Sequence, residues 1–359
     1  MNLLFIQPQP CIRALKYAQG LKKRYSPKIT FAYAKTTLNE LYGQGDELFD
    51  RWIKIKGDPQ ESLQESLSSL PIDLIHSHNA PDYLTIAAIE AVKSLGKNTP
   101  VVHDTHDLMS VRTTPYEGKD ISSLLADEKI ALSQSDGVIF VSSAMEESVR
   151  KKYGEIPANR LIFPNYLPES LVPEKIKTKA RNDGEIHIVY EGTLDSGTGS
   201  HYDFISIFRE IAAQGLHLHI YPSKEHPAYR SLAAESPRIH YHERLSPSSL
   251  LEEITQYDFG WAGFNGEKNR EHLEMVLPNK AVEYVSAGLP IIAFDFHSLK
   301  EFVEEYAVGL VCKNVNDLNS LLRSKKAEEV KEEVRKKRFS FTVEKNIPQL
   351  WEFYHSLLV

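Results

Sequence analysis

Short apolar runs alternate with amphipathic stretches along the first half of the chain. The first run, at residues 3–6, ends before Pro8 and is typical of a buried strand in a parallel sheet. Residues 12–24 then space their apolar side chains as an amphipathic helix does, with a basic opposite face. Further strand patterns lie at residues 29–33, 72–76, 100–103 and 137–141, and helical patterns at 82–95, 117–133 and 144–152. The alternation predicts a parallel sheet with helices on both faces.

The alternation stops at residues 164–184, which carry prolines and lysines without periodicity and indicate an interdomain linker. It then begins again, with strand patterns at 186–191, 216–221, 259–262 and 290–294, and helical patterns at 202–214, 246–256, 278–287 and 316–358. We therefore expect an α/β protein of two Rossmann-like, doubly wound domains. The expected division is a domain at 1–168, a linker at 169–185, a second domain at 186–335 and a closing segment at 336–359.

Composition narrows the class of protein. The 359 residues carry a net charge of -7, which argues against nucleic acid as a partner because phosphate binding needs a basic surface. The two cysteines, Cys11 and Cys312, are far apart, which excludes a disulfide framework and a cysteine zinc site. The start of the chain lacks the pattern of a signal peptide, and no segment has the roughly 20 apolar residues of a membrane span. We expect a cytoplasmic protein.

Two clusters of polar side chains follow predicted strands of the first domain, at residues 76–79 (HSHN) and 103–107 (HDTHD). Ligands of open α/β sheets bind at such strand ends. For Asn79, Asp82 and Asp107 we favour helix capping over catalysis. Metal binding is a weaker interpretation because no HExxH spacing is present. The favoured interpretation places the histidines in an interdomain cleft, where they hydrogen-bond a polar ligand.

The second domain carries two further clusters. Residues 190–200 (YEGTLDSGTGS) form a glycine-rich turn after a strand, where backbone N–H groups can approach an anion, although such turns are often only turns. Residues 277–293 combine a short helix, Gly288 as its C-terminal stop and a strand. Lys280 and Glu283 share one face of this helix. A surface ion pair there contributes only a few tenths of a kcal/mol, whereas a glutamate that binds a ribose diol contributes roughly 1.5–3 kcal/mol.

Three segments carry a resemblance to a known family. PNKAVEYVSAGLPIIA resembles the nucleotide-sugar-binding signature of GT-B glycosyltransferases, in particular the retaining family 4, also called group 1. IDLIHSHNAPDYLTIAAIEAVKSLGKNTPVVHDTHDL resembles the N-terminal domain of that family, and FSFTVEKNIPQLWEFYHSLL resembles its closing helix. The resemblance implies the GT-B architecture, in which two domains face each other across a cleft. The N-terminal domain is then on the acceptor side, and the closing helix packs back toward it.

The resemblance also implies roles for individual residues. It makes Glu283 the ligand of the nucleotide ribose, puts His106 against the donor sugar, and places Gly192 and Thr193 in the loop that faces the diphosphate. It implies a reaction without metal or cofactor, in which helix N-termini and basic side chains stabilise the departing nucleoside diphosphate. The implied catalytic residues are His106, Asp107 and Lys280, and the implied donor-binding residues are Gly192, Thr193, Asn279, Lys280 and Glu283.

The chain departs from the family pattern in its charges. Met275 stands where the family often has the first of two glutamates, and GTLDSGTGS lacks the usual basic pair. The glycine loop after the first strand is replaced by residues 7–13. Other side chains must then contact the diphosphate or the acceptor, and the candidates are Arg13, His78, Arg112 and Lys268, with Arg270 as a further source of charge.

We expect the chain to transfer a sugar from a UDP- or GDP-sugar to a glycan or lipid-linked hydroxyl, with retention, in surface polysaccharide or glycoconjugate synthesis. One alternative is a non-hydrolysing sugar-nucleotide 2-epimerase, which shares the fold. Another is a catalytically silent relative that binds sugar nucleotides. The basic residues at 16–28 are a candidate for peripheral membrane contact, although simple solvation is the favoured interpretation.

Overall fold

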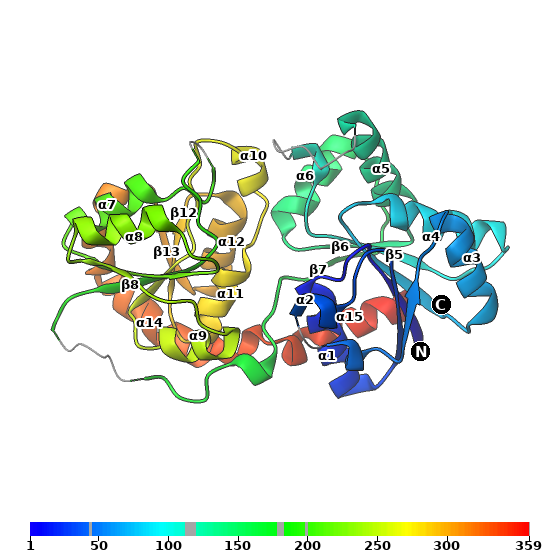
Figure 1. Ribbon diagram of the computed structural model, residues 1–359, viewed down its shortest axis with the longest axis horizontal. Helices are drawn as coiled ribbons and strands as arrows, with labels where there is room; N and C mark the ends of the chain where they lie inside the picture. Colours follow the sequence, from blue (N-terminus) through cyan, green and yellow to red (C-terminus); the bar gives the residue numbers. More distant parts are fainter. Residues whose placement is uncertain (43–44, 112–119, 178–182, 198–199, 359) are drawn as a thin grey trace. The chain divides into compact units, whose positions relative to one another are not determined.

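The computed structural model describes residues 1–42, 45–111, 120–177, 183–197 and 200–358. The chain divides into two compact units (Figure 1). Unit 1 comprises residues 1–164 and 343–359, and unit 2 comprises residues 165–342. Both ends of the chain therefore belong to unit 1.

Unit 1 contains a seven-stranded sheet in the order β3-β2-β1-β4-β5-β6-β7, with every neighbouring pair parallel. The inner strand β1 has four fully buried side chains in succession, as expected for a strand covered on both faces. The strands are β1 Asn2–Ile6, β2 Lys28–Tyr33, β3 Arg51–Lys54, β4 Leu74–His78, β5 Val101–Thr105, β6 Gly137–Phe140 and β7 Arg160–Ile162.

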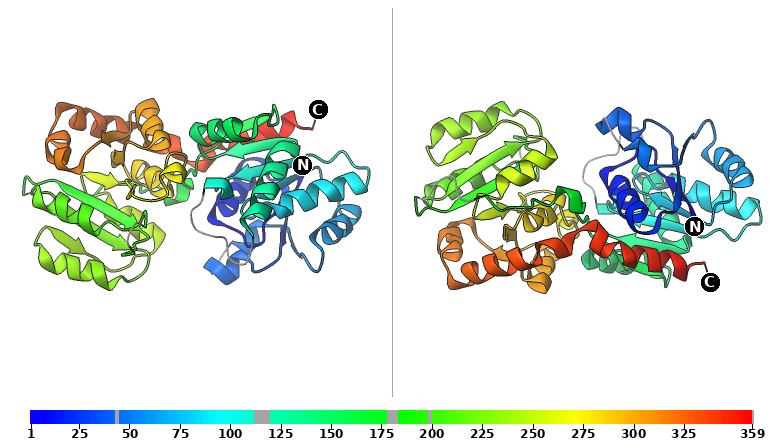
Figure 2. Two further views of the ribbon diagram at one scale, coloured as in Figure 1. Left: turned by 90° about the horizontal axis from the view of Figure 1, so that it is seen from above. Right: turned by 90° about the horizontal axis from the view of Figure 1, so that it is seen from below.

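Helices cover both faces of this sheet, as Figure 2 shows. Helix α1 packs against α15, whereas α4 packs against both α3 and α5. Several begin at a side-chain cap: Asp58 accepts from the backbone of Glu61 at the start of α3, and Ser142 accepts from Met145 at the start of α6. The helices of unit 1 are α1 Ile12–Tyr25, α2 Leu38–Tyr42, α3 Pro59–Ser69, α4 Tyr83–Ser94, α5 Ile121–Gln134, α6 Ser143–Tyr153 and α15 Val343–Ser356.

Unit 2 repeats the topology with a six-stranded parallel sheet in the order β10-β9-β8-β11-β12-β13. The strands are β8 His187–Gly192, β9 His217–Pro222, β10 Ile239–Tyr241, β11 Phe259–Trp261, β12 Ile291–Phe294 and β13 Gly309–Cys312. In both units the strand order reverses beside the first strand, between β1 and β4 and between β8 and β11. Ligands of doubly wound sheets bind at this switch point, outside the carboxyl ends of the strands.

In unit 2, α7 packs against α8, and α11 packs against α9 and α14. Helix α14 is strongly charged, yet it buries Ala327, Val330 and Val334 on one face and keeps its charges on the other. The helices of this unit are α7 Ile205–Ala213, α8 Pro227–Glu235, α9 Pro247–Ile254, α10 Arg270–Leu273, α11 Asn279–Ser286, α12 His297–Tyr306, α13 Leu318–Leu322 and α14 Lys325–Lys337.

The unit boundaries fall at other residues than the sequence suggests. Unit 2 begins at Asn165, and residues that follow it are fastened to this unit: the backbone of Lys177 donates to the Thr255 hydroxyl at 3.0 Å. The closing segment is not one helix. Helix α14 ends at Lys337 within unit 2, and α15 begins at Val343 within unit 1.

The basic side of α1 is largely engaged by other parts of unit 1. Lys16 is buried, Lys22 forms an ion pair with Asp50, and Lys23 lies 3.5 Å from Glu344. In the described part of the chain, no helix combines the length and the apolar character that crossing a bilayer requires.

Candidate active site

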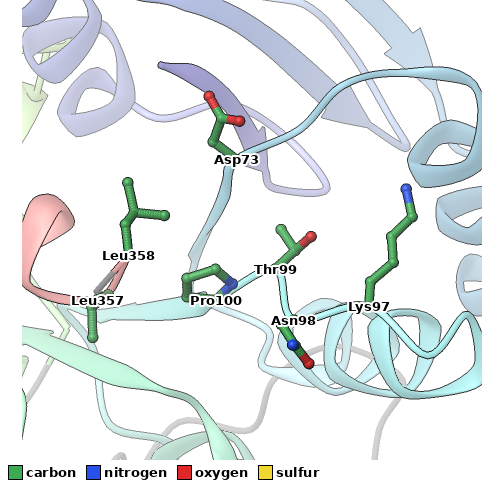
Figure 3. A pocket seen from close by; sticks show the side chains of 7 residues that line it. All are labelled: Asp73, Lys97, Asn98, Thr99, Pro100, Leu357 and Leu358. Carbon is green, nitrogen blue, oxygen red and sulfur yellow. The ribbon is translucent and has the colours of Figure 1, made fainter.

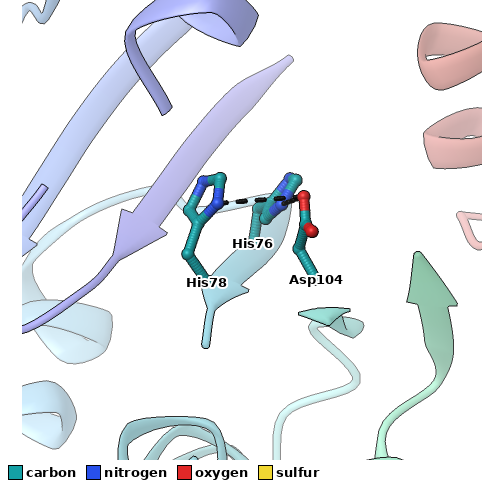
Figure 4. A group of neighbouring side chains, drawn as sticks. All are labelled: His76, His78 and Asp104. Atoms are coloured by element: carbon teal, nitrogen blue, oxygen red, sulfur yellow. Dashed lines mark hydrogen bonds and ion pairs between the residues drawn. The ribbon is translucent and has the colours of Figure 1, made fainter. Parts of the chain in front are cut away.

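The first three residues of each polar cluster of unit 1 lie inside a strand rather than after it. Strand β4 runs to His78 and β5 runs to Thr105, so His76, His78 and Asp104 are sheet residues with no solvent exposure. Figure 4 shows the two imidazoles beside the Asp104 carboxylate. His76 Nε2 lies 3.2 Å and His78 Nδ1 3.8 Å from Asp104 Oδ2. The structure therefore places His76 and His78 in the interior of unit 1, away from solvent.

A buried guanidinium balances this cluster. Arg13 of α1 donates from Nε to both Asp104 oxygens at 3.0 Å and from Nη2 to the Phe163 carbonyl at 2.7 Å. Burial alone would raise the pKa of Asp104, but Arg13 and the two histidines outweigh it and hold that pKa well below its usual value. Asp104 is therefore ionised, and Arg13 is its counter-ion.

Two candidate contacts with the diphosphate or acceptor lie in the interior of unit 1, and their roles stay predictions. Arg13 is only 3% exposed and its charge is used by Asp104, while His78 is fully buried. Burial has the largest effect on the pKa of His78 and lowers it well below its usual value, so the ring is neutral. Polar residues on these two strands form an internal network instead. Arg112, a third candidate, lies outside the described residues.

His106 and Asp107 follow β5 and are half-buried. Asn79, which follows β4, organises them: its Oδ1 accepts from the His106 backbone N–H at 3.0 Å, and its Nδ2 donates to the Asp107 carbonyl. Asn79 therefore ties together the two loops at the switch-point edge and is not a helix cap. His106 Nδ1 has no hydrogen-bond partner among the described residues and is out of contact with solvent.

In unit 2 the glycine-rich cluster and the short helix α11 meet. Gly192 ends β8 with φ 120°, a conformation that favours glycine, and a Cβ there would lie 3.5 Å from Lys280 Nζ of α11. The backbone of Glu191 donates to the Tyr284 hydroxyl at 2.9 Å, which fastens the end of β8 to α11. The structure thus brings together Gly192 and Lys280, which are 88 positions apart in the sequence numbering (280 − 192).

The Lys280 ammonium group is buried and donates no compensating hydrogen bond to the described residues. It is 7% exposed, and Nζ has no hydrogen-bond partner among the described residues. Its neighbours are the faces of Tyr190, 4.1 Å from Nζ to the ring centre, and Tyr202, 5.8 Å away. Burial lowers the pKa of Lys280 to about 8, although Glu191 and Glu283 act in the opposite direction. A desolvated ammonium of this kind favours an anionic ligand.

Glu191 is a site residue that sequence reasoning did not single out. It is half-buried beside Lys280 and Glu283, and burial followed by the Glu283 charge raises its pKa to about 8. The only sequence signal is its place directly before Gly192 at a strand end. Glu283 is half-buried on the same side of α11 as Lys280, as the spacing predicts.

The amino end of α11 is free of a side-chain cap. Pro278 stands at the N-cap position and offers neither a capping oxygen nor an N–H group. The Ala281 N–H donates to the Pro278 carbonyl at 3.0 Å, and the positive end of the helix dipole at this terminus favours an anion. Asn279, the first residue of α11, is exposed. Thr193, which directly follows Gly192, is exposed as well. Lys268 is exposed on the segment before α10, and Arg270 lies 3.0 Å from Glu274.

Within the described part of the chain, two groups of side chains have the composition of a metal site, and each has a guanidinium beside it. One is His76, His78 and Asp104, next to Arg13. The other is Asp183, His187 and His217, where Arg238 lies 3.0 Å from His217 Nε2. A fixed positive charge at such short range opposes cation binding. The expectation of a reaction without metal stays a prediction.

A hollow of about 450 Å³ lies elsewhere on unit 1 (Figure 3). Its walls come from the segments that precede β4 and β5 and from the end of the chain, namely Asp73, Lys97, Asn98, Thr99, Pro100, Leu357 and Leu358. These segments are at the amino ends of the strands. The hollow is thus on the opposite edge of the sheet from His106 and Asp107.

Family models match both units. Glycosyltransferase Family 4 matches residues 48–165, and the Glucosyltransferase 3-like C-terminal domain matches residues 196–346. The second match contains Gly260, Lys280 and Glu283. The chain is a glycosyltransferase of the GT-B type.

Solved structures agree with this glycosyltransferase in fold over its whole length. Sucrose-phosphate synthase from Thermosynechococcus elongatus has a TM-score of 0.68 at 16% identity, covering 99% of this chain and 98% of its own. The lipopolysaccharide outer core galactosyltransferase WaaB has 0.70 at 13%, covering 99% of both chains. Anabaena HepE, in complex with UDP, has 0.71 at 14%, covering 99% of this chain and 100% of its own. No curated protein matches the chain.

The matches confirm the expected fold class and the resemblance to glycosyltransferase family 4 for the first unit. The second unit of the glycosyltransferase matches a Glucosyltransferase 3-like domain, which is a finer assignment than the sequence motifs allowed. The roles of His106, Asp107, Lys280 and Glu283 stay predictions.

Proposed function

We propose that unit 2 binds a nucleoside-diphosphate sugar, UDP-linked in the first instance, and that the enzyme transfers the sugar to a glycan or lipid-linked hydroxyl with retention. The observation that carries the proposal is the unpartnered Lys280 ammonium against Gly192 at the uncapped start of α11. This combination, at the switch-point edge of the sheet, suits a diphosphate. The UDP and UDP-glucose complexes of HepE support the choice of nucleotide.

Each group in this arrangement has a distinct task in the proposal. Lys280 and the first N–H groups of α11 stabilise the negative charge that develops on the departing nucleoside diphosphate. Gly192 lets the ligand approach the backbone because it has no side chain. Glu283 accepts hydrogen bonds from the ribose hydroxyls. His106 and Asp107 of unit 1 contact the donor sugar, and Lys268 is a further candidate for the diphosphate.

Lys280 also explains how the chain manages without the basic pair that GTLDSGTGS lacks. The charge comes from α11 rather than from the loop after β8, and Gly192 brings the loop to it. This favours an active enzyme over the silent relative. Both family models are glycosyltransferase models, and neither favours the epimerase.

Calorimetric titration with UDP and GDP tests the proposal. We expect micromolar binding of at least one of the two, and a loss of affinity of about 10- to 150-fold in Lys280→Ala and in Glu283→Ala, the range for bonds to charged groups. Lys326→Ala and Glu252→Ala, which change exposed residues of the same unit, serve as controls and should bind normally. Wild-type protein that binds neither nucleotide contradicts the proposal.

Turnover is measured separately as nucleotide release from UDP-glucose with glycan and glycolipid acceptors, and the anomeric configuration of the product is read by NMR. Release that depends on the acceptor and on Lys280 supports transfer. Conversion of the donor to an epimer without nucleotide release contradicts it.

A further inference from the structure

Two buried amide side chains join loops that follow neighbouring strands of unit 1. Gln7 directly follows β1 and Asn79 directly follows β4, and they are only 4% and 1% exposed. Gln7 Nε2 donates to the Asn79 carbonyl at 3.2 Å, and Gln7 Oε1 accepts from the backbone N–H of Cys11, the N-cap residue of α1, at 3.0 Å. The Gln7 amide therefore connects the start of α1 to the loop after β4, across the switch point of the sheet.

Asn79 extends this connection to the loop after β5. Its Oδ1 accepts from the backbone N–H groups of His106 and Asp107, at 3.0 and 3.4 Å, and its Nδ2 donates to the Asp107 carbonyl. Its own backbone N–H donates to the Asp104 carbonyl at 3.0 Å. The loops after β1, β4 and β5 are thus held to one another by two side-chain amides, which we call the amide bridge (Gln7 and Asn79).

The hydrogen bonds of Asn79 require an amide. Two N–H groups face its oxygen and one carbonyl faces its nitrogen, and an amide offers an acceptor and a donor together. An ionised aspartate only accepts, so Asn79→Asp would turn an oxygen toward the Asp107 carbonyl. Alanine would leave all three backbone groups without this partner, in a buried place where an unmade hydrogen bond is costly.

We propose that Gln7 and Asn79 are positioning residues of the transfer step, which hold the backbone of His106 and Asp107 in place against the donor sugar. The inference rests on the proposed function, in which unit 2 binds the nucleotide and these two residues contact the sugar. Strand β5 ends at Thr105, so His106 and Asp107 lie beyond its ladder, and Asn79 supplies hydrogen bonds that a neighbouring strand no longer provides. Burial keeps the amide bridge itself away from substrate.

The proposal divides the effect of a variant between the two parts of the donor. The nucleotide is bound by unit 2, so Asn79→Ala should bind UDP within about twofold of the wild type. The sugar is no longer correctly contacted, so kcat for UDP release from UDP-glucose should fall about 100-fold, the usual result of a displacement of about 1 Å at a reacting group. Asn79→Asp keeps the acceptor and should lose less, about tenfold.

The same measurements on Gln7 test whether the two amides act together. Gln7→Ala should lower kcat about tenfold, because it acts on His106 and Asp107 only through Asn79. The double variant with Asn79→Ala should be no slower than Asn79→Ala alone, within about threefold, since residues that act as one unit are not additive. Asn98→Ala is the control, because Asn98 is exposed at the opposite edge of the same sheet, and it should follow the wild type.

Calorimetry with UDP, UDP release from UDP-glucose with the glycan and glycolipid acceptors, and a thermal melt of each variant make up the experiment. A folded Asn79→Ala protein with wild-type kcat overturns the inference, and so does one that loses UDP affinity in step with kcat. If that variant does not fold, Gln7→Ala and Asn79→Asp decide by the same two readouts. A lowered melting temperature with normal kcat means a purely structural role.

These outcomes differ from a failure of the proposed function. Wild-type protein that binds neither UDP nor GDP, or that binds UDP and releases none from UDP-glucose, contradicts the proposed function. Loss of UDP affinity in Lys280→Ala together with normal kcat in Asn79→Ala leaves the donor site of unit 2 in place and removes only the amide bridge from the mechanism.

Discussion

The guanidinium Nε of Arg13 lies 3.0 Å from both carboxylate oxygens of Asp104, and both side chains are withdrawn from solvent. The pair joins α1 to the central strand β5. The Asp104 carboxylate also forms a hydrogen bond with one ring nitrogen of His76. The other ring nitrogen of His76 contacts the Tyr354 hydroxyl of α15. One carboxylate therefore connects the first helix, the sheet and, through His76, the last helix of unit 1. This network has a structural task.

Replacing Arg13 with alanine should destabilise unit 1 by about 3–5 kcal/mol, because it leaves the Asp104 charge buried without a counter-ion. Urea denaturation at pH 7 measures the loss. Arg51→Ala is the matched control, since Arg51 is exposed on β3 of the same unit, and it should change the stability by less than about 0.5 kcal/mol. A stable Arg13→Ala protein that has lost only its affinity for UDP would restore Arg13 as a nucleotide contact.

The periodicity of the chain was enough to predict most of the fold. Buried runs such as residues 3–6 and 137–141 became central strands, and Lys280 and Glu283 came out on one side of a helix that starts after Pro278. These features depend on local patterns. Short edge strands such as β3 and β10 carry charged or half-buried residues and were not predicted. The pattern on an edge strand is weak because only part of it faces the core.

The pairing of distant polar residues could not be predicted. Arg13 and Asp104 are 91 positions apart, and the sequence around each residue gives no sign that the two side chains pair. The His-Ser-His sequence of β4 suggested a loop because polar residues are rarely buried, yet the ion pair and the ring contacts make burial tolerable there. Glu191 was hidden for a related reason: its importance comes from Lys280 and Glu283, which only the fold brings near.

We expect Gly260 to affect the proposed donor site indirectly, through the position of Tyr284. It lies in the middle of β11, and a Cβ at this position would come within 2.2 Å of the Tyr284 ring. The Tyr284 hydroxyl holds the backbone of Glu191 at 2.9 Å. Gly260→Ala must therefore displace Tyr284 and with it the junction between β8 and α11. We predict a loss of stability of about 1–3 kcal/mol, the usual cost of overpacking, and a fall in UDP affinity of at least tenfold.

Thermal denaturation and UDP titration measure these two effects on the same protein samples. Gly197→Ala is the control: among the described residues, the atom nearest to a Cβ there is an Asp195 carboxylate oxygen at 3.4 Å, on an exposed segment. Normal UDP affinity in a destabilised Gly260→Ala protein would show that the position of Tyr284 does not govern the donor site.

Histidines are stacked across one edge of the unit 2 sheet. His187 Nδ1 lies 2.9 Å from His219 Nε2, and His219 Nδ1 lies 3.0 Å from His242 Nε2. The Asp183 carboxylate, 3.3 Å from His187 Nε2, accepts a hydrogen bond from this nitrogen. His187 must then accept from His219, and His219 from His242, so each ring carries its proton on Nε2. Protonation of His219 would place two donors face to face and break the chain of bonds.

Acid should therefore weaken unit 2. Burial, reinforced by the neighbouring histidines, lowers the pKa of His219 to about 2, against about 6.5 in the unfolded chain. Below pH 6.5 the unfolded state binds the proton and the folded state does not, so stability is lost as the pH falls. At pH 5, about 1.5 units below the unfolded pKa, this single group costs about 2 kcal/mol relative to neutral pH.

Hydrogen exchange of peptides that span β9 reports the stability of this part of unit 2 at pH 7.5 and pH 5, after correction for the intrinsic exchange rate. We expect His219→Gln to reduce the difference between the two pH values by about 2 kcal/mol, because glutamine does not titrate. His297→Gln, at an exposed position of the same unit, should leave the difference unchanged. An equal loss of protection at pH 5 in wild type and His219→Gln would mean that another group, and not the buried imidazole of β9, makes unit 2 sensitive to acid.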